Sequence, residues 1–418
     1  MRHTARRHDM LRSSFADSGE HPVRVIHEDD VTGLRVRTVN ADDLAPFVRE
    51  VIAEPFSLRE PPLVRFTLLR GPAEDVFVMV AHHIVVDAGS QGVIMRDLFE
   101  SYRARRAGEA VDLPEPTATY ADHVRAERGL LASPRMGELA AYWREICAGA
   151  PIALDLPADR PRPPVQRYRG AAVATRLPEH VLSALHDAAR RAHVTPFVFL
   201  VGVFELLLHR YTGRPDFLIG CATSTKDRRM ADVVGFFVNP VLLRPVVGTR
   251  TTFRELVTGT SAQLRRATAY RHYPFPMLPA ALGVPHDPSR SPLFQVLVTA
   301  YMAGGGDALV DELFQGEGRG PFEYKGVRVA ATPMPAQQTG QFDLTLELQM
   351  SRRSIGVTLK YATDLFDAGT VERLARWFVV LVESACADLD GVAGRLPMTD
   401  VAERDLLLSA GTAAPLDW

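Results

Sequence analysis

Two adjacent histidines and an aspartate follow an apolar run, in the stretch VMVAHHIVVDAGSQGV at residues 78–93. Imidazole titrates near pH ~6.5, so His82 and His83 are candidates for taking up a proton at neutral pH. Neighbouring residues on a strand point to opposite faces. Only one of the two rings can therefore face a given cavity. We expect one working histidine and one structural histidine, whose ring nitrogens need partners of their own.

Asp87 has two interpretations that the spacing leaves open. It is either a partner for a histidine or half of a buried ion pair, because a carboxylate buried without a counter-charge is costly. A wholly structural His-His-Asp cluster fits the pattern as well as a catalytic one does. A metal site is disfavoured, since adjacent histidines on a strand cannot easily ligate one ion and no third ligand lies nearby in the sequence.

The histidines are predicted to lie in a connection from a strand to a helix. Residues 63–70 and 76–81 are expected to form two strands joined by the turn GPAED. The second strand is apolar at every position, which is typical of a strand buried on both faces. Beyond Gly89 the apolar residues follow a helical period, and Ser90 is placed to cap that helix.

A proline-rich segment at residues 154–170 is the predicted boundary between two domains, because its four prolines disfavour helix and sheet. In QFDLTLELQM apolar and polar residues alternate, so one face of this strand is expected to be solvated or to line a cavity. The mixture of strands and helices in two halves predicts an α/β or α+β fold. Further helices are expected at 180–193, 196–212 and 368–387, and further strands at 217–222, 241–246 and 293–301.

Composition narrows the class of protein. The chain has 418 residues and a formal net charge of −2, which gives no indication of nucleic acid or an anionic membrane as partner. The three cysteines, Cys147, Cys221 and Cys386, are far apart and form no zinc or disulfide pattern. No apolar stretch reaches the roughly 18 residues that a membrane helix needs, and no signal peptide is visible. We therefore predict a soluble, cytoplasmic protein.

Several segments resemble, in order and spacing, the motifs of one family. AHHIVVDAGS resembles the HHxxxDG motif of the condensation domains of nonribosomal peptide synthetases, which share their fold with chloramphenicol acetyltransferase. YATDLFDAGTVERL and DVAERDLLL (400–408) resemble the last helix and the linker toward an adenylation domain. The resemblance covers nearly the whole chain. The other motifs of this family are resembled by RHDMLRSSF (7–15), TYADHV (119–124), VVGFFVNPVLLR (233–244), YRHYPFPML (270–278) and HDPSRSPLFQV (286–296).

The resemblance implies a fold of two chloramphenicol-acetyltransferase-like lobes that form a V with a tunnel between them. Residues 1–160 would form the N-terminal lobe with HHxxxD, residues 161–395 the C-terminal lobe, and residues 396–418 an exit linker toward a following domain. The chain begins inside the family's second motif. Either the true protein is longer, or the N-terminal lobe lacks its opening strand and helix and its sheet exposes an edge.

The resemblance also implies an activity. The domain would form an amide bond between an acyl or peptidyl donor and an aminoacyl acceptor, each held as a thioester on the 4′-phosphopantetheine of a carrier domain. Upstream donor and downstream acceptor carriers, and an adjacent adenylation domain, would be its partners, and it would need no cofactor or metal of its own. His83 would take a proton from the acceptor amine, or orient it, with His82 as structural partner. Asp87 would pair with Arg12, with Arg7 as a weaker candidate.

Four more residues lie in motifs. Asn239 and Ser291 would lie near the tunnel, although loop and strand structure explains them equally well. Ala88 stands where the motif has glycine, with Gly89 one position late. If that position needs a positive φ or close approach of substrate, the methyl group would strain the loop or narrow the tunnel. We expect altered acceptor use and retained activity.

Two other functions are considered. One is a stand-alone acyltransferase of the same fold with a soluble amine or alcohol acceptor. The other is a non-catalytic domain that docks carriers. Within the family, cyclisation domains replace the histidines by aspartates and oxygenase-recruiting variants lose the second histidine, whereas this chain keeps both. The segment GFFVN disfavours an epimerisation domain, and HDPSRSPLFQV resembles the subtype with an L-configured donor.

Overall fold

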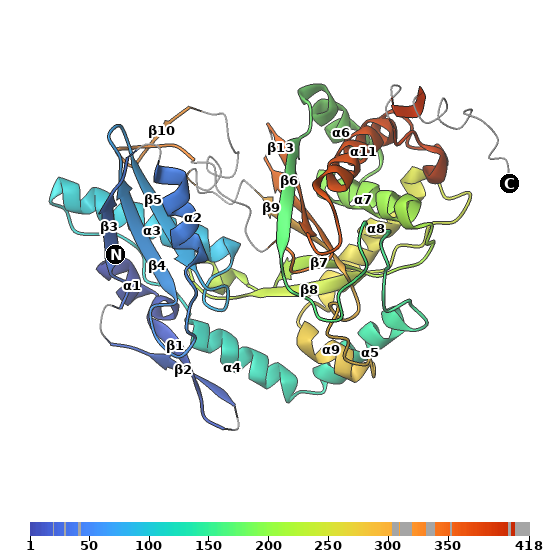
Figure 1. Ribbon diagram of the computed structural model, residues 1–418. Coiled ribbons are helices and arrows are strands. Elements are labelled where there is room, and N and C mark those ends of the chain that lie inside the picture. Colours follow the sequence, from blue (N-terminus) through green and yellow to red (C-terminus); the bar gives the residue numbers. More distant parts are fainter. Residues whose placement is uncertain are drawn as a thin grey trace. The chain divides into compact units, whose positions relative to one another are not determined.

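The computed structural model describes residues 1–19, 21–28, 31–40, 43–302, 309, 320–331, 339–351, 353–399 and 403–405. The chain divides into two compact units, each assembled from separate stretches. Each combines helices with a β-sheet, so the mixed fold class is confirmed (Figure 1). The first unit comprises the described parts of Met1–Ser133, Ser224–Val238 and Gly304–Pro335, and the second those of Pro134–Thr223, Asn239–Ala303 and Ala336–Trp418.

The first unit contains a three-stranded sheet of order β3-β4-β5. β4 and β5 form the predicted antiparallel hairpin, whereas β3 runs parallel to β4. β5 lies at the end of this order, with Val76 and Val78 buried but Phe77 and Met79 only partly so, and it is therefore not buried on both faces. The helices and strands of this unit are α1 (Arg2–Arg7), η1 (Asp9–Arg12), β1 (Ser13–Asp17), β2 (Pro22–Ile26), β3 (Leu34–Thr38), α2 (Leu44–Ala53), β4 (Val64–Arg70), β5 (Asp75–Ala81), α3 (Ala88–Ala107), α4 (Tyr120–Leu131), η3 (Arg228–Met230), β10 (Phe322–Tyr324) and β11 (Val327–Val329).

The second unit contains a six-stranded sheet of order β6-β13-β12-β9-β7-β8. Helix α7 is almost wholly apolar and buried; Thr195 caps it, Pro196 opens its first turn and Gly213 (φ 68°) ends it. The helices and strands predicted beyond the proline-rich segment are present. Those of this unit are α5 (Arg135–Cys147), β6 (Gly170–Arg176), α6 (Glu179–Arg191), α7 (Pro196–Thr212), β7 (Ile219–Ser224), β8 (Val238–Leu243), α8 (Phe253–Ala269), η4 (Phe275–Met277), α9 (Leu278–Ala281), β9 (Val296–Met302), β12 (Leu344–Met350), β13 (Ile355–Ala362), α11 (Ala368–Ala387) and η5 (Ala393–Arg395).

The polar side of β12 is largely buried, so of the two expected alternatives, a solvated face or a face that lines a cavity, the solvated face is wrong. Glu347 is 6% exposed and Lys360 of the neighbouring β13 is 8% exposed. Their Oε2 and Nζ atoms lie 2.6 Å apart. Ion pairing lets two charged groups leave water together, so alternation along a strand does not by itself reveal solvent on the polar side.

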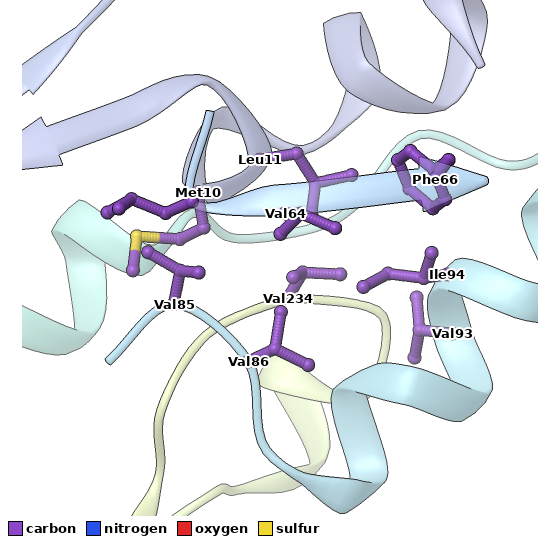
Figure 2. Close-up of a cluster of buried hydrophobic side chains, with 10 residues drawn as sticks. Met10, Leu11, Val64, Phe66, Val85, Val86, Val93, Ile94 and Val234 are labelled. Atoms are coloured by element: carbon purple, nitrogen blue, oxygen red, sulfur yellow. The ribbon is translucent and has the colours of Figure 1, made fainter. Parts of the chain in front are cut away.

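A hydrophobic cluster holds the connection between β5 and α3 in place (Figure 2). Val85 and Val86 of this connection are buried beside Ile94 of α3 and Val234. Burial of such side chains stabilises the fold by about 1.5–3 kcal/mol each. The cluster also contains Met10, Leu11, Leu63, Val64, Phe66 and Val93. Both ends of the connection are thus anchored in apolar packing.

The two units are not divided at residue 160, where the proline-rich segment predicts the boundary. The indole Nε1 of Trp143 donates to the Tyr270 carbonyl (3.2 Å), and the Leu154 amide donates to Gln295 Oε1 (2.7 Å). These contacts tie α5 and the proline-rich segment to the second unit. Of the exit linker predicted at 396–418, only 396–399 and 403–405 are described.

Among the described helices, none is long and apolar enough to cross a membrane alone. The pair α6 and α7, bent by 98°, passes the length and composition criteria only when taken together.

Candidate active site in the first unit

His82 opens the connection between β5 and α3 and is held by backbone groups. Its amide donates to the Leu63 carbonyl (2.9 Å), and its Nδ1 accepts from the Ile84 amide (3.1 Å). Because Nδ1 accepts, the proton of the neutral ring lies on Nε2. The ring meets Phe56 edge-on at a centroid distance of 6.2 Å. Burial, and then the neighbouring His83, lower the pKa of His82, so this ring stays neutral at neutral pH.

His83 is oriented by one ring nitrogen, and no described residue forms a hydrogen bond with the other. Its Nδ1 lies 2.7 Å from the carbonyl oxygen of Val86. A carbonyl can only accept, so Nδ1 carries the proton and Nε2 keeps a lone pair. The ring of Phe236 stands edge-on to the imidazole, with centroids 5.0 Å apart. His83 is half-buried. A half-buried imidazole with a fixed tautomer and a free basic nitrogen has the properties of a general base.

Asp87 caps helix α3 and does not pair with Arg12, which corrects the predicted ion pair. Its Oδ1 accepts from the Ser90 amide (2.8 Å) and its Oδ2 from the Phe237 amide (3.1 Å). Its own amide donates to the Gly235 carbonyl (3.0 Å). The carboxylate is 4% exposed, and backbone donors at the helix N-terminus compensate its lost hydration.

Arg12 forms hydrogen bonds to backbone carbonyls of the N-terminal segment. Its Nε donates to the Ala5 carbonyl (2.9 Å), and its guanidinium also donates to the His27 carbonyl. These bonds join Arg12 to α1 and to the residue that follows β2, so the arginine of the second motif secures the N-terminal segment itself.

Arg7, the weaker candidate, binds a different aspartate. Its Nε lies 2.8 Å from Asp97 Oδ2 on α3, and His8 Nε2 lies 2.9 Å from the same oxygen. Arg96 donates to the other oxygen, Oδ1 (2.9 Å). Burial alone would raise the pKa of Asp97, but the hydrogen bonds from His8 and Arg96 lower it overall. The second motif therefore anchors to Asp97 in the middle of α3, ten residues beyond the cap Asp87.

Ser90 is not the helix cap but a link between two motifs. Its Oγ donates to the Gly235 carbonyl (2.9 Å) and accepts from the Gly235 amide (3.0 Å). Ala88 and Gly89 form the first turn of α3, and neither has a positive φ. The glycine that the motif has at position 88 is thus not required by backbone conformation here, because a helical φ suits alanine well.

Gly235 allows a third motif to reach this site. A Cβ at this position would lie 2.2 Å from Tyr120 Cδ2, so no side chain fits. The Tyr120 hydroxyl donates to the Phe236 carbonyl (3.0 Å), and burial raises the pKa of Tyr120 to about 12. The segments AHHIVVDAGS, TYADHV and VVGFFV (233–238) therefore converge in one unit. Tyr120 and Phe237 were not among the predicted site residues, although both lie inside recognised motifs.

Lys226 places a cation next to this cluster, although no sequence pattern indicated it. Its Nζ lies 5.3 Å from the centre of the Phe237 ring. Burial lowers the pKa of Lys226, while the carboxylates of Asp87 and then Asp232 raise it. No motif marks this lysine, because its relation to Asp87 depends on a loop from a distant part of the chain.

Asn239 and Ser291 belong to the second unit and have structural partners. The Asn239 amide nitrogen donates to the carbonyls of Arg271 (2.6 Å) and Tyr273 (2.7 Å), and its Oδ1 accepts from the Phe275 amide (2.9 Å). The Ser291 carbonyl accepts from Gln295 Nε2 (2.9 Å). Asn239 has three of its hydrogen-bonding sites engaged by backbone, as expected of a residue that shapes a loop.

The described residues contain no group of three or more His, Cys, Asp or Glu side chains arranged to hold a metal ion. The group suited to catalysis is therefore the His83 imidazole, a base held on the connection between β5 and α3.

Comparison with known proteins identifies the family. The family model described as Condensation domain matches residues 1–408. The chain is 32% identical over 415 residues to one of the subunits of linear gramicidin synthase from Brevibacillus parabrevis, covering 97% of this chain and 5% of that protein. It is 31% identical over 415 residues to surfactin synthase subunit 2 of Bacillus subtilis, covering 98% of this chain and 11% of that protein.

Solved structures agree in fold. A four-domain nonribosomal peptide synthetase bound to AMP and glycine matches with a TM-score of 0.86 at 22% identity, over 96% of this chain and 31% of that one. The X-domain from teicoplanin biosynthesis matches with a TM-score of 0.81 at 25% identity, over 95% and 88% of the two chains. The chain belongs to the condensation domain family of nonribosomal peptide synthetases. It spans a small part of the length of these curated synthetases.

Proposed function

We propose that this domain forms an amide bond between a carrier-bound acyl or peptidyl thioester and the amine of a carrier-bound aminoacyl group. The observation that carries the proposal is the hydrogen bond from His83 Nδ1 to the Val86 carbonyl, which leaves Nε2 basic. Membership in the family supplies the reaction class.

The reaction needs little from the protein besides a base and good positioning. The acceptor amine attacks the thioester carbonyl carbon, the new C–N bond forms, and the C–S bond breaks. The amine loses one proton to His83 Nε2, and the departing thiolate gains one, so the products are an amide and a free thiol. Holding both reactants in place converts a bimolecular reaction into an effectively unimolecular one. Base catalysis adds typically 10²–10⁴-fold.

The surroundings of His83 support a fixed base. Val85 and Val86 are buried, and the Phe236 ring packs edge-on against the His83 imidazole. Asp87 and Ser90 bind the segment that carries Phe236 through the amide of Phe237 and both backbone groups of Gly235. An imidazole held in this way loses little conformational entropy when it engages a substrate.

The proposed partners are an upstream donor carrier, a downstream acceptor carrier and a neighbouring adenylation domain, with both substrates on 4′-phosphopantetheine. The similarity to multidomain synthetases supports this arrangement over a stand-alone acyltransferase. Retention of His83, whose Nε2 has no hydrogen-bond partner among the described residues, supports catalysis over a purely docking role. We propose the cytoplasm as the compartment, on the scattered cysteines of the sequence.

The test is a single-turnover transfer assay with a donor-loaded and an acceptor-loaded carrier supplied in trans, read by intact-protein mass spectrometry. Wild-type protein should move the acyl group onto the acceptor carrier. His83→Ala should not, whereas His180→Ala, which removes an exposed histidine of the second unit, should behave as wild type. Equal transfer by wild type and His83→Ala, above the rate without enzyme, would remove His83 from the chemistry. No transfer by wild type with several donor and acceptor pairs would favour the docking role.

A further inference from the structure

The first unit contains a cavity that the site around His83 does not use. Its volume is about 380 Å³, and it lies between the strands β3 and β4 and the helix α2. Small-molecule sites in proteins typically have volumes of about 300–1,000 Å³. None of the described residues that line the cavity belongs to the connection between β5 and α3.

The periods of the strand and the helix bring charged side chains to this cavity. Arg35 and Arg37 alternate along β3, so both point to the sheet face that carries Thr67, the partner of Arg35 on β4. Glu50 of α2 and its C-cap Glu54 are four positions apart and therefore share a helix face. The walls of the cavity thus carry two guanidinium groups and two carboxylates.

One of these carboxylates, that of Glu54, is firmly paired. Its Oε2 lies 2.6 Å from Arg35 Nη1, and its Oε1 lies 3.2 Å from Nη1 of the buried Arg65. The hydrogen bond from Arg35 lowers the pKa of Glu54, burial opposes this, and the charge of Arg65 lowers the pKa further. Glu54 is therefore ionised and shared by two arginines, and it forms a fixed wall of the cavity.

The other pair, Arg37 and Glu50, is loose. The Nη1 and Oε1 atoms are 3.6 Å apart, beyond normal hydrogen-bond length, and the two side chains are 51% and 65% exposed. The Arg37 Cζ lies 5.9 Å from the centre of the Phe47 ring. None of the described residues forms a hydrogen bond with the side chain of Arg37 or Glu50. Both charges can therefore turn to a ligand without breaking a short contact.

Thr67 adds a buried hydroxyl to the lining of the cavity. The residue is 2% exposed, and its Oγ1 has no hydrogen-bond partner among the described residues. Buried polar groups in proteins are nearly always paired, and an unpaired one is unfavourable. A polar ligand atom in the cavity would remove this cost. The buried Val51 of α2 supplies an apolar part of the wall.

We propose that this cavity binds a zwitterionic α-amino acid with an apolar side chain. The ligand carboxylate accepts hydrogen bonds from the guanidinium of Arg37, whose planar fork matches carboxylate geometry. The ligand ammonium lies against Glu50, a polar ligand atom pairs with the Thr67 hydroxyl, and the apolar side chain contacts Val51. A simple anion would meet the like charge of Glu50, and a simple cation that of Arg37, so the mixed lining favours a ligand with both charges. The proposal does not depend on the transfer activity.

Calorimetry with L-phenylalanine tests the class of ligand. Wild-type protein should bind it with a Kd on the order of 1 mM or tighter. Two analogues keep the same carbon skeleton with one charge each: 3-phenylpropanoate lacks the ammonium, and 2-phenylethylamine lacks the carboxylate. Each should bind about tenfold more weakly. Equal binding of either analogue would overturn the zwitterion assignment, and no saturable binding of L-phenylalanine or L-leucine would overturn the site itself.

Variants locate the ligand. Arg37→Met and Glu50→Gln should each weaken binding of L-phenylalanine about tenfold, and Arg37→Met should also abolish the preference over 2-phenylethylamine. Thr67→Val should weaken binding without lowering the melting temperature of the free protein, because the lost hydroxyl has no described partner. The control Arg49→Met, on an exposed part of α2 outside the cavity, should match wild type. Undiminished binding by Arg37→Met and Glu50→Gln would place the ligand elsewhere and overturn the proposal.

Discussion

His83 donates its Nδ1 proton to the carbonyl oxygen of Val86, three residues further along the chain, at 2.7 Å. The acceptor is backbone, and the side chain of Val86 is buried in the cluster of Figure 2. The tautomer of the candidate base is therefore fixed by the hydrophobic core and not by an acidic partner. Asp87, which the motif places nearby, caps α3, and none of the hydrogen bonds described for it goes to the imidazole.

This arrangement separates base catalysis from positioning. His83→Gln places an amide near the position of Nε2 without a basic nitrogen, and His83→Asn keeps a donor near Nδ1 for the Val86 carbonyl. If proton removal matters, both variants should lose ~10²-fold or more in single-turnover transfer. If orientation of the amine dominates, His83→Gln should retain much more activity than His83→Asn. Melting temperatures near that of wild type would serve as the control for folding.

Asp87→Ala should destabilise the protein. The cause is the loss of a helix cap and of an acceptor for a buried amide, and not the loss of an ion pair with Arg12. The substitution removes the cap of α3, which is worth about 1 kcal/mol, and leaves the buried Phe237 amide without an acceptor, at about 1–3 kcal/mol. Asp87→Asn should cost less, because asparagine also caps helices well. Urea unfolding gives both values. An Asp87→Ala variant as stable as wild type would mean that the Phe237 amide finds another acceptor.

The hydrogen bonds of Arg12 to backbone carbonyls, in place of the predicted ion pair with Asp87, can be tested separately. Arg12→Met should destabilise the N-terminal segment by loss of its bonds to the Ala5 and His27 carbonyls. Because Arg12 and Asp87 share no partner among the described residues, their effects on the free energy of unfolding should add within about 0.5 kcal/mol in the double variant. A larger coupling energy would restore the ion pair that the family resemblance implied.

Gly235→Ala tests the convergence of three motifs. The new methyl group would overlap the Tyr120 ring, whose Cδ2 lies 2.2 Å from the ideal Cβ position. Overpacking of this kind costs typically about 1–3 kcal/mol, and here it should also displace Phe236 from His83. Combining it with Tyr120→Ala should recover part of the lost stability by opening space. If Gly235→Ala is neutral in both unfolding and transfer, the segment is looser than the contacts indicate.

Much of this site could be predicted from the sequence, and the remainder had no signature there. The periodicity of residues 63–107 indicates the hairpin and helix that flank the histidines, and adjacency on a strand indicates that the two rings differ in role. The partner of Asp87 could not be found this way, because it is the amide of Phe237, 150 positions later, and every residue except proline carries such a donor. The residues 224–238 join the first unit through loop contacts that follow no local period. Lys226 lies in this stretch, so its place near Asp87 could not be predicted from the sequence either.

Glu205 should make the stability of the protein depend on pH. It lies fully buried on α7, with Oε2 2.5 Å from the Thr260 hydroxyl and Oε1 without a partner among the described residues. Burial raises the pKa of Glu205 to about 8, despite the hydrogen bond from Thr260, which lowers it. The folded state thus binds a proton that the unfolded chain releases near its ordinary value of 4.5. The contribution is fully present below pH 4.5 and is lost as the pH rises through 8.

The magnitude is on the order of 4 kcal/mol between these pH values, since each unit of pKa difference corresponds to about 1.4 kcal/mol. Glu205→Gln keeps the shape and removes the titration. The difference in unfolding free energy between Glu205→Gln and wild type, measured in urea at pH 5 and again at pH 8, should shift in favour of the variant at the higher pH. Comparison at each pH cancels the other titrating groups. A constant difference would mean that Glu205 is ionised in the fold and has a counter-charge or water that compensates it.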